Sequence, residues 1–143
     1  MSAADTELIA AALAARQRSY SPYSHFRVGA ALRCPDGHVV TGTNVENASF
    51  GLSICAERAA VARAIAEDRR AFTAIAICAD GEQPTPPCGA CRQVLLELAP
   101  DLTVLLAGER GADGEVVRTT IGALLPAAFR DFPGSRRSGT GGK

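Results

Sequence analysis

The segment S-I-C-A-E-R-A-A occupies residues 53–60, and the segment P-P-C-G-A-C-R-Q occupies residues 86–93. The first segment opens a predicted helix over residues 55–67, and the second opens another predicted helix that ends near Pro100. Between the two helices, F-T-A-I-A-I-C at residues 72–78 reads as a buried strand. These three elements form the centre of the chain, and the other elements are placed around them.

The remaining elements are a first helix, a hairpin, two further strands and a short last helix. Asp5 or Thr6 is predicted to cap the first helix, which ends near residue 18. The hairpin strands flank C-P-D-G, a suitable tight turn. The hairpin strands are predicted at residues 26–32 and 39–45, and the two further strands at residues 102–106 and 116–118. The last helix is predicted at residues 120–129. The resulting order, αββαβαββα, predicts an α/β fold: a three-layer αβα sandwich with a mixed five-stranded sheet.

The composition describes one domain without net charge. The 143 residues suffice to bury a core, and we assign residues 1–132 to a single domain and expect a disordered tail over residues 133–143. Fifteen basic and fifteen acidic residues cancel, which disfavours a nucleic-acid polymer as a partner. We find no apolar run long enough to cross a bilayer and no signal-peptide pattern, so we expect a cytoplasmic protein without a membrane partner.

Three cysteines have the spacing of a zinc site. Cys88 and Cys91 form a C-x-x-C pair at the start of one predicted helix, and Cys55 begins the other. Helix N-termini stabilise thiolates, so the three sulfur atoms are candidates to hold one Zn²⁺ per chain. Three protein ligands leave one tetrahedral position free for water, as in catalytic zinc sites. Glu57, two residues after Cys55, is placed to take a proton from such a water.

The same residues also fit simpler roles. Buried apolar cysteines or a redox pair would each account for the C-x-x-C segment, although a redox pair leaves Cys55 and Glu57 without a role. Glu57 taken alone would be an ordinary exposed carboxylate on a first helical turn. Cys34 and Cys78 lie in or beside predicted strands, which favours burial in the core for both.

Two arginines are candidates to balance the charge of the metal site. Three thiolates around Zn²⁺ carry a net negative charge, which a guanidinium can reduce by donating hydrogen bonds to sulfur. Arg58 directly follows Glu57 and is predicted to act in this way. Arg92 directly follows Cys91 and is a second candidate. An ordinary surface position is the alternative for each arginine.

The chain resembles the cytidine deaminases, namely their small, homotetrameric, zinc-dependent type. The resemblance spans roughly residues 8–129, and its segments are specific in combination. The pattern C-A-E…P-C-x-x-C is also the one that zinc-dependent base deaminases share. The matching segments are S-Y-S-P-Y-S-H-F-R-V-G-A-A-L from Ser19, G-T-N-V-E-N-A-S-F-G-L-S-I-C-A-E-R from Gly42, P-P-C-G-A-C-R-Q-V-L-x-E from Pro86 and L-L-P-A-A-F from Leu124.

The resemblance implies a binding site for a nucleoside. It implies that Asn44 and Glu46 hydrogen-bond the ribose hydroxyls, that Phe26 contacts the base, and that the main chain around Ala56 positions the pyrimidine. It also implies a homotetramer in which Phe129 reaches into a neighbouring subunit's site. From spacing alone, Asn44 and Glu46 share a side and could grip a diol, but loop capping by Asn44 is equally compatible. The alternative for Phe129 is packing on its own chain.

The expected function is hydrolytic deamination of cytidine and 2′-deoxycytidine to the uridines, with release of ammonia, in pyrimidine salvage. Glu57 would shuttle the protons. A free nucleoside needs no base flipping, which agrees with a short and neutral chain. Two other functions remain open. One is the same chemistry on another substrate, such as blasticidin S or an oligonucleotide base. The other is a noncatalytic zinc module with a fourth ligand such as His25 or His38.

Overall fold

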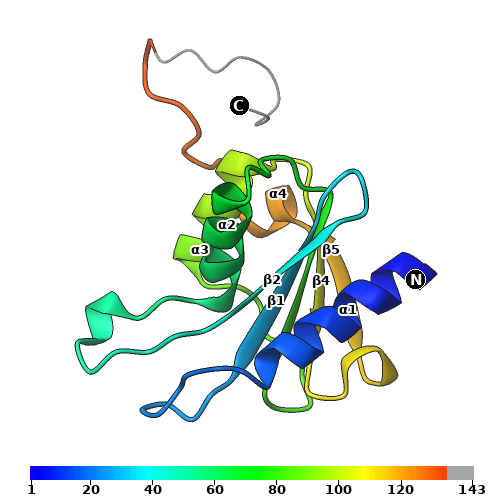
Figure 1. Cartoon of the computed structure of the whole chain (residues 1–143). Helices are drawn as coiled ribbons and strands as arrows, with labels where there is room; N and C mark the ends of the chain where they lie inside the picture. Colours follow the sequence, from blue (N-terminus) through cyan, green and yellow to red (C-terminus); the bar gives the residue numbers. More distant parts are fainter. Residues whose placement is uncertain (135–143) are drawn as a thin grey trace.

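The computed structural model describes residues 1–134, which form one mixed sheet with helices on both faces (Figure 1). The five strands are ordered β2-β1-β3-β4-β5 across the sheet. β1 pairs antiparallel with β2 and with β3, β3 pairs parallel with β4, and β4 pairs antiparallel with β5. The predicted mixed five-stranded sheet is confirmed. In chain order its strands are β1 (Val28–Arg33), β2 (Val39–Thr43), β3 (Ala74–Ala79), β4 (Thr103–Ala107) and β5 (Val116–Thr120).

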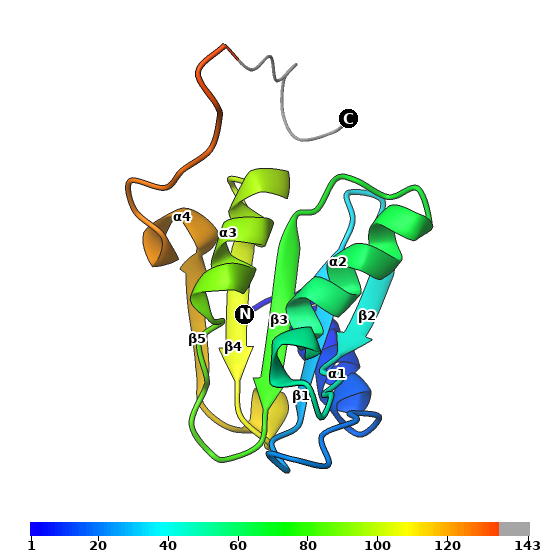
Figure 2. The same cartoon turned by 90° about the vertical axis from the view of Figure 1, so that its left-hand side faces the viewer.

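The helices form the two outer layers. Figure 2 shows α2 and α3 side by side on one face of the sheet, with α1 on the other face. α1 packs against β1 and β3, and α2 packs against β2 and β1. The order αββαβαββα agrees with the prediction. Within the described residues the α-helices are α1 (Ala3–Arg16), α2 (Ala56–Ala66), α3 (Gly89–Leu98) and α4 (Ile121–Leu124), and the 3-10 turns are η1 (Phe50–Leu52) and η2 (Gly111–Asp113).

The start of α1 differs from the prediction. Ser2, rather than Asp5 or Thr6, is the N-cap. Its hydroxyl accepts a hydrogen bond from the Asp5 N–H at 3.1 Å, and the Asp5 carboxylate accepts one from the Ser2 N–H at 3.5 Å. This reciprocal capping box starts the helix at Ala3, and the helix ends at Arg16 instead of near residue 18. The prediction of the N-cap was wrong because aspartate is common at N-caps, whereas Asp5 is the third residue of this helix and bonds back to the N-cap.

The last helix is shorter than predicted. Thr120 caps α4 by accepting a hydrogen bond from the Ala123 N–H at 3.2 Å. The helix ends at Leu124, two residues before Pro126, and a residue that precedes a proline disfavours the helical conformation. The chain from there to Phe129 is irregular.

The side chains of β3 alternate between two cores on opposite faces of the sheet. Ile75 and Ile77 lie in the larger core, with residues of α2 and α3. Ala76 and Cys78 lie in the smaller core, with residues of α1. Every residue of β3 is buried, as expected for a central strand that is covered on both faces. Cys78 and Cys34 are both buried in the core, as predicted.

Gly42 lets α2 approach β2 closely. A β-carbon at this position would lie 2.5 Å from the Ala56 carbonyl oxygen, so a larger residue would push the helix away. Gly29 plays the same part for α1, because its β-carbon would lie 2.0 Å from the Ala12 carbonyl oxygen. Cys55 is the N-cap of α2. The close contact at Gly42 therefore also positions this cysteine against the sheet.

Residues 135–143 of the predicted tail lie outside the described residues. The assignment of residues 1–132 to a single domain stays a prediction. None of the helices in the described part of the chain combines the length and the apolar character that crossing a membrane requires.

Asp5 ties α1 to two strands through ion pairs. Its carboxylate accepts hydrogen bonds from Arg33 Nη1 at 3.1 Å and from Arg118 Nη1 at 2.7 Å, and its side chain is only 5% exposed. Burial by itself would raise the pKa of Asp5. The hydrogen bonds from Arg33, Arg118 and Ser2 outweigh this effect, so that the pKa lies below its ordinary value of 3.8.

We expect Asp5→Asn to lower the free energy of unfolding near pH 7 by about 1–3 kcal/mol. Because folding lowers the pKa of Asp5, the stabilisation is present above pH 3.8 and is lost as the pH falls through the lower pKa of the folded state. Urea unfolding at several pH values measures this. The difference between wild type and variant should shrink below about pH 4, and a constant difference would contradict the assignment.

Candidate active site

A cavity of about 280 Å³ opens where α2 begins, and residues far apart in the sequence converge on it. Its walls come from the chain before β1, the loop after β2, the start of α2, the end of β3 and the loop before α3. A larger hollow of about 620 Å³ between α1 and β5 contains none of the predicted site residues. The predicted site residues that line the smaller cavity are Phe26, Asn44, Glu46, Cys55, Ala56, Glu57 and Cys88.

Two of the three predicted zinc ligands, Cys55 and Cys88, line this cavity, and the buried Cys91 lies next to them. Cys55 is the N-cap of α2, Cys88 is the N-cap of α3, and Cys91 lies in the first turn of α3. Their sulfur atoms all lie within 4.8 Å of one another, and Cys55 Sγ lies 3.8 Å from Cys88 Sγ. Tetrahedral zinc with Zn–S bonds of about 2.3 Å would place its ligands about 3.8 Å apart, so the sulfur positions fit this ion. Among the described residues, no other group of His, Cys, Asp or Glu has such a geometry.

The electrostatic surroundings of the sulfur atoms also fit a metal cation. Cys91 is fully buried, and burial, followed by the charge of Glu57, raises the pKa of its thiol, which differs from the stabilised thiolate expected at a helix N-terminus. Hydrogen bonds with Cys91 and Cys55 lower the pKa of Cys88. Arg58 Nη2 donates to Cys55 Sγ at 3.6 Å, and the hydrogen bonds to Cys55 and Cys91 raise the pKa of Arg58. Arg58 therefore lies where the charge-balancing prediction requires. A thiol in such a place is deprotonated when it coordinates a cation, which agrees with zinc.

Glu57 lies in the first turn of α2 and lines the cavity. The residue is 4% exposed, so it is not the solvated carboxylate that its place on a first helical turn would suggest by itself. Burial raises the pKa of Glu57 above its ordinary value. A carboxylate whose pKa is shifted towards neutral pH both accepts and donates protons more readily, as general acid–base catalysis requires.

Arg92 and Phe129 do not line the cavity of their own chain. Arg92 Nε donates to the Pro87 carbonyl oxygen at 2.8 Å, and Arg92 Nη1 donates to the Leu124 carbonyl oxygen at 2.8 Å. These bonds brace the loop before α3, and they end at main-chain oxygens instead of sulfur atoms. Phe129 is 59% exposed, and its ring meets that of Phe132 with the centroids 5.5 Å apart.

Asn44 organises one wall of the cavity. Its Oδ1 accepts hydrogen bonds from the Val28 N–H at 2.9 Å and from the Ser19 hydroxyl at 2.5 Å. Its Nδ2 donates to the Phe26 carbonyl oxygen at 2.8 Å. An amide nitrogen carries two hydrogens, so one N–H remains for a ligand. Loop capping and ligand binding, the two roles that spacing alone allows for Asn44, are thus both compatible with this geometry.

Glu46 holds the loop that precedes Phe26. Its Oε1 accepts hydrogen bonds from the Tyr23 N–H at 3.0 Å and the Ser24 N–H at 3.1 Å, and its Oε2 accepts one from the Ser24 hydroxyl. The hydrogen bonds from Ser24 lower the pKa of Glu46, which keeps the carboxylate ionised and able to accept further hydrogen bonds. Ser24 was missed as a site residue, although the polar stretch around it was the available signal.

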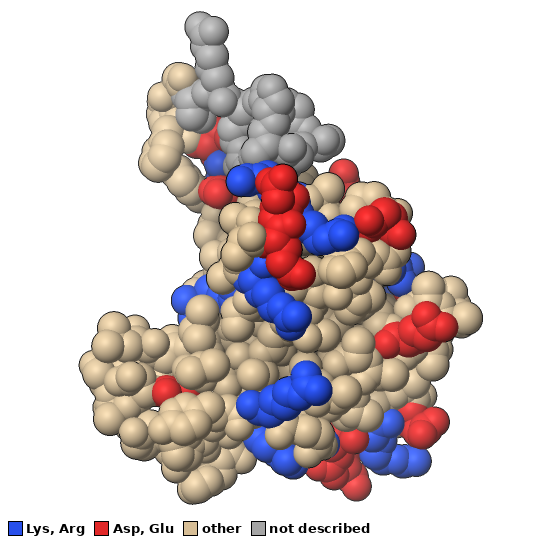
Figure 3. All heavy atoms as spheres, viewed as in Figure 1, with Lys and Arg blue, Asp and Glu red and all other residues tan. Residues whose placement is uncertain are grey.

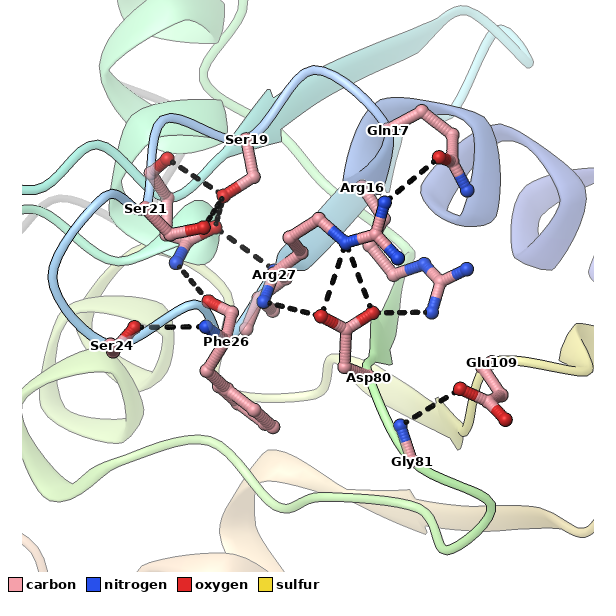
Figure 4. A network of polar contacts seen from close by, with 12 residues as sticks. Arg16, Gln17, Ser19, Ser21, Ser24, Phe26, Arg27, Asp80, Gly81 and Glu109 are labelled. Carbon is pink, nitrogen blue, oxygen red and sulfur yellow. Dashed lines mark hydrogen bonds and ion pairs between the residues drawn. The ribbon is translucent and has the colours of Figure 1, made fainter.

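Asp80 is a second residue that the sequence analysis missed. It directly follows β3, and Figure 4 shows its carboxylate in contact with the side chains of both Arg16 and Arg27. Arg16 Nη1 donates to Asp80 Oδ1 at 2.7 Å, and the Arg27 main-chain N–H donates to Asp80 Oδ2 at 2.9 Å. Burial alone would raise the pKa of Asp80, but the hydrogen bonds and charges of the two arginines lower it. A charged residue directly after a buried strand was the signal in the sequence.

Three thiols and a buried glutamate at helix N-termini are the active-site groups of zinc-dependent deaminases, enzymes that remove an amino group from a nucleobase. The sequence model of one family, the cytidine and deoxycytidylate deaminase zinc-binding region, matches residues 2–107 of the chain. The chain belongs to this cytidine deaminase family, whose members bind zinc.

Individual relatives agree with the family assignment. The chain is 51% identical over 122 residues to a cytidine deaminase of Halalkalibacterium halodurans. These aligned residues cover 85% of this chain and 91% of the relative. It is 45% identical over 122 residues to a cytidine deaminase of Mycobacterium tuberculosis, and this alignment covers 83% of this chain and 86% of the relative. A blasticidin-S deaminase of Bacillus cereus is 28% identical over 133 residues, which cover 87% of this chain and 91% of the relative.

Solved structures confirm the fold class. The crystal structure of a cytidine deaminase from Burkholderia pseudomallei is 50% identical in sequence and superposes with a TM-score of 0.82, covering 90% of this chain and all of the other. A cytidine deaminase structure from Mycobacterium tuberculosis is 40% identical and has a TM-score of 0.73, covering 86% and 94% of the two chains.

We propose that Cys55, Cys88 and Cys91 hold one zinc ion per chain, and we expect Cys88→Ala to lose that ion. Cys88 is exposed, so its truncation leaves no cavity in the core and should not unfold the protein. Cys34→Ala is the matched control, because Cys34 lies in the larger core and outside the sulfur cluster. Elemental analysis of both purified variants measures the zinc content. A full complement of zinc in Cys88→Ala would refute the ligand assignment.

Proposed function

We propose that this protein catalyses the hydrolytic deamination of cytidine and 2′-deoxycytidine to uridine and 2′-deoxyuridine, with release of ammonia, as a step of pyrimidine salvage. The observation that carries the proposal is a buried carboxylate, Glu57, next to three clustered thiols in a cavity of about 280 Å³. That volume lies just below the range of about 300–1,000 Å³ that is usual for small-molecule pockets, which agrees with a ligand as small as a nucleoside. The family assignment supports the same substrate class.

The chemistry divides between the metal and the side chains around it. Cys55, Cys88 and Cys91 would hold the zinc ion, which would act as a Lewis acid and lower the pKa of a water molecule. Glu57 accepts a proton from this water and passes it to N3 of the ring, while the water oxygen bonds to C4. Glu57 then carries the second proton of the oxygen to the amino group, so that the C4–N bond breaks and ammonia leaves. Arg58 reduces the negative charge on Cys55 by its hydrogen bond.

The remaining cavity residues bind the nucleoside. Asn44 offers its free amide N–H and Glu46 its ionised carboxylate to the ribose hydroxyls. Phe26 is 39% exposed, so its ring is available to contact the base. The first N–H groups of α2, around Ala56, have no partner within the helix and are available to polar atoms of the pyrimidine.

The cavity favours a nucleoside over its phosphate ester. Among the described residues that line it there is no Lys, Arg or His, while Glu46 and Glu57 both carry carboxylates. A 5′-phosphate would therefore enter without a cation to pair with and would be repelled by ionised Glu46.

The two rival functions are less well supported. The same chemistry on blasticidin S is weakened because the chain is 28% identical to the blasticidin-S deaminase but 51% identical to one of the cytidine deaminases. A closed zinc module would need a fourth protein ligand, and the metal-binding group of the described residues contains neither His25 nor His38. Such a module would also give no reason for burying Glu57.

We further propose a homotetramer whose subunits complete one another's sites through Phe129. Large apolar side chains project into solvent from the loops around residues 20–26 and 45–53, which form the protruding lobe in Figure 1. Figure 3 shows few charged side chains on this lobe, whereas acidic and basic side chains intermingle over the rest of that face. Exposed apolar surface of this kind marks a contact with another molecule. The exposed residues that argue for assembly are Tyr20, Tyr23, Val45, Phe50, Leu52 and Phe129.

We also propose a cytoplasmic location. All five cysteines are unpaired, and a zinc site made of three thiols requires them to stay reduced. Cytoplasmic thiol pools keep cysteines in that state.

Glu57→Gln tests the proposed function. The substitution preserves size but removes the proton carrier, so we expect zinc to be retained and cytidine turnover to fall by at least about 10²–10⁴-fold. Ultraviolet absorbance follows the conversion of cytidine, with cytidine 5′-monophosphate as the comparison substrate and zinc analysis as the control. Turnover by Glu57→Gln within a few-fold of wild type would exclude this role. A zinc-loaded wild type without activity on cytidine would exclude the function itself.

Complementation tests the shared site. Glu57→Ala and Phe129→Ala are each expected to be nearly inactive but assembled. Co-expression then gives mixed oligomers in which some sites combine an intact Glu57 from one chain with an intact Phe129 from another. Activity should return in these oligomers if Phe129 acts on a neighbouring subunit. If it acts within its own chain, every site carries one defect, and mixed oligomers without recovered activity would reject the proposal.

A further inference from the structure

We propose that Asp80 is a positioning residue, which holds the cavity wall formed by Phe26 and Val28 in place for nucleoside binding. Asp80 does not itself line the cavity, so it would act through these neighbours. The inference rests on the proposed function and adds a residue to it that neither the zinc cluster nor the proton transfer requires.

Asp80 forms hydrogen bonds with both main-chain groups of Arg27, the N–H and the C=O. The Asp80 carboxylate accepts the Arg27 N–H at 2.9 Å, and the Asp80 N–H donates to the Arg27 carbonyl oxygen at 3.0 Å. The Arg27 side chain adds a contact from Nε to Oδ2 at 3.1 Å. β1 begins only at Val28, so Arg27 precedes the strand and depends on Asp80 for these bonds.

The residues on either side of Arg27 are the ones that face the cavity. Phe26 and Val28 both line it, because side chains two apart in an extended chain share a side. Asn44 binds the Phe26 carbonyl oxygen at 2.8 Å and the Val28 N–H at 2.9 Å. Asp80 and Asn44 therefore hold three consecutive residues between them. Figure 4 shows the contacts between Asp80 and Arg27, with Phe26 next to them.

The turn before this segment requires such restraint. His25 has a φ of 55°, in the left-handed region that a residue other than glycine rarely adopts. The chain thus enters the cavity wall in a conformation that its local preferences oppose. Hydrogen bonds hold it there, and one of them runs from the Phe26 N–H to the Ser24 hydroxyl at 3.0 Å.

The negative charge of Asp80 balances the positive charges of Arg16 and Arg27, which explains why an aspartate stands at this position. The Arg16 side chain is only 7% exposed, and its Nη1 lies 2.7 Å from Asp80 Oδ1. The carboxylate thus pairs with this guanidinium and with that of Arg27 at the same time (Figure 4). A neutral amide in its place would leave two positive groups close together, one of them buried without a counter-charge. Arg27, and with it Phe26, would then move.

Steady-state kinetics of Asp80→Asn test the proposal. We expect the KM for cytidine to rise about tenfold, with kcat within about twofold of wild type and with zinc retained, because a positioning bond is lost far from the reacting atoms. Asp5→Asn is the matched control: Asp5, which lies on α1, also bridges two arginines, but neither Arg33 nor Arg118 is next in sequence to a residue that lines the cavity. It should lower thermal stability without changing KM. An unchanged KM in Asp80→Asn, or an equal rise in Asp5→Asn, would overturn the proposal.

A double-mutant cycle separates positioning from general stabilisation. If Asp80 acts through Phe26, then Asp80→Asn lowers kcat/KM about tenfold in the wild type but less than about twofold when Phe26→Ala is already present. Equal factors in both backgrounds would show that Asp80 does not act through this ring, and would reject the proposal.

Asp80→Glu decides the question if Asp80→Asn does not fold. It keeps the charge between the two arginines but moves the carboxylate by about 1.5 Å, so the same rise in KM is expected. A wild-type KM in Asp80→Glu would overturn the role of Asp80. The outcomes stay distinct from those of the proposed function, because an inactive zinc-loaded wild type rejects the function and this inference together, whereas an active wild type with unaffected variants rejects only the inference.

Discussion

Three sulfur atoms from the starts of two helices lie within 4.8 Å of one another, and much of the fold serves to keep them there. β2 and β3 both run antiparallel to β1 and therefore in the same direction, so that α2, which follows β2, and α3, which follows β3, begin at the same end of the sheet. The close contact at Gly42 fixes α2 against β2. A slip of one helical turn, about 5.4 Å, would exceed the spacing of the sulfur atoms and abolish the cluster.

The cavity beside this cluster is organised before any ligand enters. Asn44 and Glu46 are already hydrogen-bonded to the chain around Phe26, and Arg58 already donates to Cys55. Polar groups that are held in place lose little conformational freedom on binding, which favours both affinity and catalysis. Glu57 is buried beside them, and this burial raises its pKa.

The candidate residues of the site could be predicted because each half of the motif depends on residue types at short spacings, although the meeting of Cys55 with Cys88 depends on the fold. A C-x-x-C pair at a helix start, or a glutamate two residues after a cysteine, keeps its local geometry in any fold that forms the helix. Arg92 shows where that reasoning stops. Its position beside Cys91 suggested a hydrogen bond to sulfur, but its side chain reaches main-chain oxygens of two other segments. Which of several acceptors a long side chain meets depends on packing that spacing does not encode.

By itself, the sequence determined the order of helices and strands, the fold class, the candidate metal and the carboxylate beside it, because periodicity and short motifs are local properties. The ends of α1 and α4 were placed less well, since a cap such as Ser2 competes with nearby residues of the same kind. Only the tertiary structure decided that Asp80, fifty-three residues away in sequence, holds Arg27, and that the free hydrogen-bonding capacity of Asn44 is one N–H. Contacts between distant segments follow from how the sheet and helices pack, and a single sequence contains no pattern that reports them.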